Sequence, residues 1–118
     1  MWSDTVQNLI VNPGPCGRLE GAAHYGAFGV PGEGPYFVLW LAVGEAGIQS
    51  ASFDTYGCVA ALATGTLLVR LLVGRTLAQV EEITAKDLTL LLGGLPEGKG
   101  HIPDMAITAL KQALQSGV

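Results

Sequence analysis

The sequence is short of charged residues, of basic clusters and of cysteine, and each shortage excludes a class of protein. Only 14% of the 118 residues are charged while 49% are hydrophobic, which is the opposite of the balance found in disordered chains. Ten acidic residues against six basic ones give a formal net charge of −4. Surfaces that bind nucleic acid or anionic membranes carry concentrated positive charge. We therefore expect neither kind of partner.

The two cysteines, Cys16 and Cys58, are too few for a fold held together by disulfides. The first residues have neither the positive charge nor the apolar stretch of a secretory signal. The longest apolar run, over 58–73, carries Arg70 near its end and is shorter than the roughly 20 residues that a membrane span needs. We therefore expect a cytoplasmic protein that does not cross a membrane.

The N-terminal third combines one helical pattern with a region dense in glycine and proline. An amphipathic helix is predicted over 3–11, with Ser3 as its N-cap. Residues 14–35 then hold much of the glycine and proline of the chain, which is typical of a loop. Within that loop we expect a short edge strand near 18–23.

The rest of the chain predicts a hairpin followed by helices. The runs 36–43 and 48–56 are rich in β-branched and aromatic residues and flank a Gly-containing turn, which indicates a β-hairpin. Helices are expected over 58–73, 76–82, 84–92 and from Pro103 onward. The predicted core residues are Phe37, Leu39, Leu41, Phe53, Leu62, Leu67, Leu68 and Leu110. This order indicates an α+β fold with a small antiparallel sheet, in one domain over 1–118 made of 1–35, 36–56 and 57–118.

Cys58 is the first candidate for chemistry. It is predicted at the start of the helix over 58–73, where unpaired N–H groups and the helix dipole favour the thiolate. A thiolate binds metal or attacks an electrophile, although most lone cysteines are small and inert core residues. His101, in a glycine-flanked loop before the last helix, and Glu33, between two glycines, are candidates to join it. His24 is expected in the N-terminal loop.

Several segments, taken in order, resemble one family. The sequence motifs concerned are Phe53-Asp54-Thr55-Tyr56-Gly57-Cys58, Gly74-Arg75-Thr76-Leu77, Ile83-Thr84-Ala85-Lys86-Asp87-Leu88, Asn12-Pro13, Gly17-Arg18-Leu19, Gly29-Val30-Pro31, Leu95-Pro96 and Lys99-x-His101. They are similar to motifs of the NifU/IscU-type iron–sulfur cluster assembly scaffolds and cover almost the whole chain. The resemblance implies a three-stranded antiparallel sheet packed against helices.

The resemblance also implies a site, from which this sequence departs. Scaffolds of this family use three cysteines, an aspartate and sometimes a histidine to hold zinc or a nascent cluster, and they receive sulfur from a cysteine desulfurase. Here Glu33 stands at the first cysteine position, Pro35 at the aspartate position and Ile102 at the third cysteine position. Among the ligand positions of the family, only those of Cys58 and His101 hold the expected residue in this sequence.

The resemblance therefore implies a reduced ligand set of Cys58, His101 and Glu33. Because a [2Fe–2S] cluster normally takes four ligands, mostly thiolates, we expect this set to hold Zn²⁺ or Fe²⁺ with an open position, or a cluster shared between two chains. A cysteine desulfurase or another iron–sulfur assembly protein is the expected partner.

Two alternatives remain open from the sequence. In the first, the chain is a metal-free interaction or regulatory module that has kept the scaffold fold and lost the cluster site. In the second, Cys58 is the nucleophile or sulfur carrier of an enzyme with His101 as its base. No third group that would orient the base is visible in the sequence, so we expect a protein that is not an enzyme.

Overall fold

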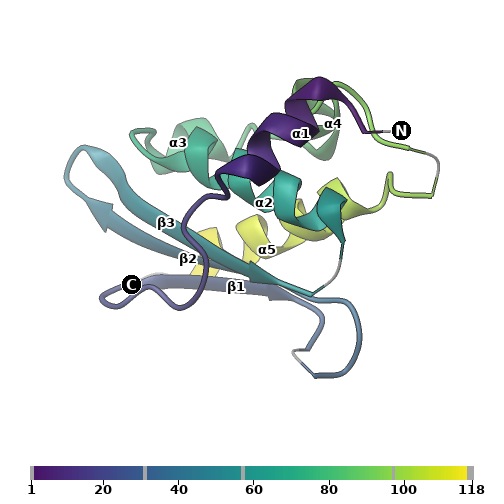
Figure 1. Ribbon diagram of the computed structural model, residues 1–118. Helices are drawn as coiled ribbons and strands as arrows, with labels where there is room; N and C mark the ends of the chain where they lie inside the picture. Colours follow the sequence, from purple (N-terminus) through teal and green to yellow (C-terminus); the bar gives the residue numbers. More distant parts are fainter. Residues whose placement is uncertain (1, 31, 57, 97, 117–118) are drawn as a thin grey trace.

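The computed structural model describes residues 2–30, 32–56, 58–96 and 98–116, and its helices lie on one face of a three-stranded sheet (Figure 1). The motif residues Pro31 and Gly57 lie outside these ranges. The strands are β1 (His24–Phe28), β2 (Phe37–Gly44) and β3 (Gly47–Thr55). The helices are α1 (Asp4–Val11), α2 (Val59–Leu72), α3 (Leu77–Val80), α4 (Ala85–Leu91) and α5 (Ile102–Ser116). Both strand pairings are antiparallel, in the order β1-β2-β3. The predicted α+β fold with a three-stranded antiparallel sheet is confirmed.

The hairpin of β2 and β3 forms two of the three strands, with β2 in the centre of the sheet. Leu39 pairs with Phe53 and Leu41 with Ala51, so apolar residues of both strands face the helices together. The rings of Phe37 and Phe53 stack with their centroids 5.7 Å apart. Every second side chain of two paired strands lies on the same face of a sheet. The antiparallel pairing of β2 with β3 confirms the predicted hairpin.

The third strand lies later in the chain than predicted. The expected edge strand near 18–23 is wrong, since β1 occupies His24–Phe28 and pairs with β2. A Cβ added at Gly26 would collide with backbone atoms of α5 at Ala109 and Ala113. The glycine that weakens the strand signal in the sequence is thus the residue that lets a helix cross the strand at close range.

His24 belongs to this strand and not to the N-terminal loop, which corrects its predicted position. Its side chain is buried, and its Nδ1 lies 2.8 Å from the carbonyl oxygen of Ala113 in α5. Two further bonds join β1 to the same helix. The backbone N–H of Tyr25 donates to Ser116 Oγ over 2.9 Å, and that of Ala27 donates to Gln112 Oε1 over 3.2 Å.

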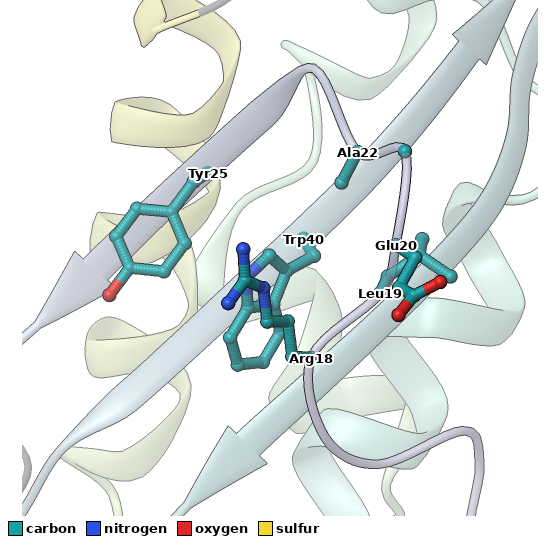
Figure 2. Close-up of a pocket in the computed structure, with 7 residues that line it drawn as sticks. Arg18, Leu19, Glu20, Ala22, Tyr25 and Trp40 are labelled. Carbon is teal, nitrogen blue, oxygen red and sulfur yellow. The ribbon is translucent and has the colours of Figure 1, made fainter.

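The segment that follows α1 runs along β3, at the edge of the sheet opposite β1. Cys16 forms a parallel bridge with Phe53 in β3. The backbone N–H of Gly17 donates to Phe53 O over 2.8 Å, and Phe53 N–H donates to Pro15 O over 3.2 Å. Beyond this bridge the chain reaches β1 by crossing the face of the sheet that the helices leave free (Figure 2).

The helices form two layers above the sheet. α2 and α5 pack on the strands, while α1 packs against α2, and α4 against α5. A Cβ at Gly65 of α2 would collide with the ring of Phe53, so the glycine admits that ring. Leu62 and Leu67 are only partly buried, which corrects their predicted place in the core. The other predicted core residues are buried.

Local capping chemistry sets the helix boundaries. Ser3 Oγ accepts the N–H of Val6 at the start of α1, as predicted. Thr76 and Thr84 open α3 and α4 with reciprocal capping boxes, in which the threonine side chain and the third residue of the helix satisfy each other's backbone groups. No helix among the described residues is long and apolar enough to cross a membrane.

Candidate functional site

The elements that flank the three predicted ligand positions meet at one end of the molecule. The end of β1, the start of β2, the start of α2 and the start of α5 all lie at the right-hand side of Figure 1. Glu33 lies in sequence between β1 and β2, Cys58 directly precedes α2, and His101 directly precedes α5. The topology therefore brings together three segments that are far apart in the sequence.

Cys58 is the N-cap of α2. Its backbone is extended, with φ −103° and ψ 179°, and its side chain makes no capping hydrogen bond. Its carbonyl oxygen accepts the N–H of Leu62, and its partly buried side chain packs against the main core. The thiol thus lies at the positive end of a 14-residue helix, where a negative charge is stabilised. The predicted place of Cys58 at the start of this helix is therefore confirmed, and its role as a ligand stays a prediction.

His101 and Glu33 are exposed, and each is placed by a turn. The carbonyl oxygen of His101 accepts the N–H of Met105 in α5, and the N–H of Glu33 donates to Val30 O over 3.0 Å. Within the described residues, no three side chains of His, Cys, Asp or Glu lie close enough together to hold a metal ion. The ligand set of Cys58, His101 and Glu33 therefore stays a prediction.

Ile102 shows what has replaced the third cysteine of the family pattern. Its side chain is 6% exposed and belongs to the main hydrophobic core. It is the first residue of α5, next to the exposed His101. A position that the family resemblance assigns to a ligand thus contributes to packing in this chain.

Cys16 lies beside Phe53 of β3, and neither Cys16 nor Cys58 forms a disulfide. The Cys16 thiol donates to Gly14 O over 3.2 Å. Partial burial, and after it the negative charge of Asp54, raises the pKa of the Cys16 thiol above its usual value. The protonated thiol is therefore favoured at Cys16, which makes this side chain a poor substitute ligand.

Two tyrosines near the same end of the sheet were not singled out by sequence reasoning. Tyr36 Oη donates to Asp54 Oδ2 over 3.3 Å, and the rings of Tyr36 and Tyr56 lie with their centroids 6.4 Å apart. Burial, followed by the charge of Asp54 and this hydrogen bond, raises the pKa of Tyr36. The sequence offered one signal for this pair, because Asp54 is the one charged residue in β3.

A hollow on the helix-free face of the sheet was also missed. It has a volume of about 450 Å³ and is lined by Arg18, Leu19, Glu20, Gly21, Ala22, Tyr25 and Trp40 (Figure 2). The rings of Tyr25 and Trp40 lie with their centroids 5.7 Å apart. The hollow exists because the chain crosses the sheet on its way to β1, a path that local sequence patterns do not encode.

Comparison with protein families matches residues 1–116 to the NifU-like N terminal domain. The chain is 33% identical over 114 residues to the iron-sulfur cluster assembly scaffold protein IscU 1 of Archaeoglobus fulgidus, covering 97% of this chain and 74% of that protein. It is 34% identical over 118 residues to the iron-sulfur cluster assembly scaffold protein IscU of Azotobacter vinelandii, covering 97% and 91%.

Solved structures show the same fold at lower sequence identity. A putative iron-sulfur cluster assembly scaffold protein for the SUF system from Fervidobacterium islandicum aligns with a TM-score of 0.63 and 14% identity, over 96% of each chain. A NifU-like protein (N-terminal) from Brucella abortus aligns with a TM-score of 0.58 and 16% identity, over 97% of this chain and 82% of that one.

Proposed function

The chain belongs to the family of NifU-like N-terminal domains, and from this we propose that it serves as a scaffold in iron–sulfur cluster assembly with a reduced ligand set. The observation that carries the proposal is the match along 97% of the chain to relatives named as such scaffolds. The family match also supports treating residues 1–118 as a single domain. We place the binding of iron, zinc or a cluster at the end of the molecule where Cys58 is the N-cap residue of α2.

The proposed ligands are Cys58, His101 and Glu33, and the bound iron, zinc or cluster is the cargo of the scaffold. One thiolate, one imidazole and one carboxylate suit a single Zn²⁺ or Fe²⁺ ion with an open position. A [2Fe–2S] cluster normally takes four ligands, mostly thiolates, so a cluster would need donors from a second chain. Loading with one ion is therefore the first step that we assign to this chain.

Binding of the ion would draw the three donors together. His101 and Glu33 are exposed and sit in turns, whereas Cys58 is fixed by its place at the start of α2. Cys58 would provide the anchor, and the two other segments would close on it. Because a thiol must lose its proton and imidazole must be neutral to bind, affinity should fall as the pH is lowered.

A scaffold of this kind does not catalyse a reaction of its own, so we propose that its sulfur is supplied in complex with another protein. A cysteine desulfurase or another iron–sulfur assembly protein is the partner that fits this role. We further propose that the chain works in the cytoplasm, where glutathione and thioredoxin keep free thiols such as that of Cys58 reduced.

Elemental analysis and anaerobic visible spectroscopy of the purified chain test the proposal. We expect about one zinc or iron per chain in the wild type, loss of that metal in Cys58→Ser, and retention in the matched control Cys16→Ser. His101→Ala should weaken the affinity by at least about tenfold, because it removes one of three donors.

The opposite result would favour the metal-free alternative. A wild-type chain that holds no metal and shows no visible absorption after anaerobic reconstitution would contradict a loading role for Cys58. Equal loss of metal in both cysteine variants would indicate misfolding or adventitious binding, and it would remove the support for this ligand set.

A further inference from the structure

The hollow on the helix-free face of the sheet has the composition of a small-molecule site. Its volume of about 450 Å³ lies within the range of roughly 300–1,000 Å³ that is typical of such sites. Most of its lining is apolar or aromatic, and Arg18 and Glu20 are its two charged residues. Sites for small ligands combine a mostly apolar wall with a few polar groups that fix the orientation of the ligand.

Aromatic rings set this hollow apart from two others on the described surface. The hollow at Leu90 and the hollow at Leu110 are lined by aliphatic, polar and charged side chains. Each of them also has one cation and one carboxylate, so charge alone does not distinguish the hollows. The pair of Tyr25 and Trp40 does, and it therefore indicates the kind of ligand.

Tyr25 and Trp40 form an aromatic platform that two paired strands hold in place. The two residues lie directly opposite each other in β1 and β2, and the backbone N–H of Tyr25 donates to Ser116 Oγ. Their ring planes are inclined by 55°, so the rings do not cover each other face to face. Tyr25 is 47% exposed and Trp40 is half-buried. A flat ring can therefore stack on this platform, as nucleobases do on aromatic side chains.

The two charged groups determine what the edges of such a ring must offer. Arg18 and Glu20 are both exposed, and Figure 2 shows the guanidinium on the side of the aromatic rings and the carboxylate on the opposite side of the hollow. A guanidinium can only donate hydrogen bonds and a carboxylate can only accept them. The ligand therefore needs one edge of acceptors and one edge of donors. Since the two charges cancel and the chain has a net charge of −4, an uncharged ligand fits better than an anion.

We propose that this hollow binds an uncharged planar heterocycle of the guanine type, stacked on Tyr25 and Trp40. The O6 and N7 atoms of guanine accept two hydrogen bonds from the Arg18 guanidinium, which is a common way for arginine to bind guanine. The N1–H and 2-amino groups of guanine donate to the Glu20 carboxylate. Adenine and the pyrimidines do not combine an acceptor pair with a donor pair in this way. The inference does not depend on metal loading, because none of the three proposed metal ligands lines this hollow.

Calorimetric titration of the chain with guanosine, with a chelator present, tests the proposal. We expect saturable binding with a Kd below about 1 mM. Trp40→Ala should lose this binding, and circular dichroism checks that the variant is folded. Trp2→Phe is the matched control, because Trp2 packs against the core and does not line the hollow. It should keep the affinity, and in this variant guanosine should quench the fluorescence of the remaining tryptophan, Trp40.

Altered ligands test the two edges without changing the sheet. Inosine lacks the 2-amino group and 7-deazaguanosine lacks the N7 acceptor, so the wild type should bind each of them about tenfold more weakly than guanosine. Glu20→Ala should abolish the preference for guanosine over inosine and keep the preference over 7-deazaguanosine. Arg18→Ala should do the reverse. Glu81→Ala, at an exposed acidic residue outside this hollow, should keep both preferences.

Four results would overturn the inference. A wild-type chain that shows no saturable binding of guanosine leaves the hollow without this ligand. Unchanged affinity in folded Trp40→Ala places the binding elsewhere. Equal affinities for guanosine and inosine in the wild type refute the contact with Glu20. Tighter binding of guanosine monophosphate, or of a neutral sugar such as maltotriose, would assign the platform to a different class of ligand.

Discussion

The interior beneath the helices and the loop end at Cys58 differ in how far their residues are constrained. Phe53 is fully buried, stacked on Phe37 and fitted to Gly65. Tyr56, three residues later, is 64% exposed. The difference shows on which residues the fold depends. The interior determines the fold by close packing, whereas an exposed side chain such as that of Tyr56 has few packing contacts to lose.

The largest effect expected from this contrast is at the aromatic core. Phe53→Ala should lower the free energy of unfolding by about 4 kcal/mol, because it leaves a cavity between the sheet and α2. Tyr56→Ala should stay within about 0.5 kcal/mol of wild type, since its ring is largely in solvent. Urea unfolding followed by circular dichroism compares the two variants. Equal losses would mean that the loop end is as constrained as the interior.

Replacing glycine by alanine at two positions tests the same difference between the interior and the loop end. Gly26→Ala should cost about 3 kcal/mol, because its Cβ would press on backbone atoms of α5 that cannot move independently. Gly100→Ala is the matched control, since a Cβ there meets no atom within 4 Å. Thermal unfolding should show a loss of more than about 10 °C for the first variant only. An unchanged midpoint for Gly26→Ala would contradict the close crossing of α5 over β1.

Prediction from the sequence succeeds for some elements of this fold and fails for others. The hairpin, the helix after Cys58 and the Ser3 cap follow from local patterns, because each depends on residues that are near one another in the chain. The strand at His24–Phe28 was missed because its existence depends on β2 and on α5, which lie far along the sequence. Leu62 and Leu67 were misjudged for a similar reason, since the exposed side of α2 is decided by which helices cover it.

The candidate site was predictable in its parts and not in its arrangement. The place of Cys58 at the start of α2 was predicted from the apolar run over 58–73. Their glycine-flanked positions and the family resemblance indicated His101 and Glu33, and the topology brings their segments to the same end of the sheet. Their distances from Cys58 depend on loop conformation, which periodicity does not describe. The burial of Ile102 likewise depends on how α5 packs.

The smallest effect is expected at the boundary of the two regions, where Asp54 lies between Tyr36 and Cys16. Asp54→Asn removes a negative charge that opposes loss of a proton, so the pKa of both groups should fall, while burial keeps some of the increase. The rate of Cys16 alkylation against pH, in a Cys58→Ser background, and the ultraviolet titration of tyrosine measure the two shifts.

The sign of the effect on stability follows from the same shifts. Both groups bind their protons more tightly in the folded chain, so the stability that they contribute is present below their ordinary pKa values and is lost as the pH rises through the raised ones. Asp54→Asn should lessen this alkaline loss. An unchanged titration of both groups in Asp54→Asn would assign the shifts to burial alone.

The hydrogen bonds at both margins of the sheet bear on aggregation. An outer strand with unpaired N–H and C=O groups is a template on which another chain can add a strand. In this protein β3 is already bridged by Pro15 and Gly17, and β1 already donates to Gln112 and Ser116 of α5. The most apolar strand, β2, lies between them. Fibril formation by the β2 sequence therefore requires the margins to open first, so its rate should follow unfolding of the chain and not its concentration alone.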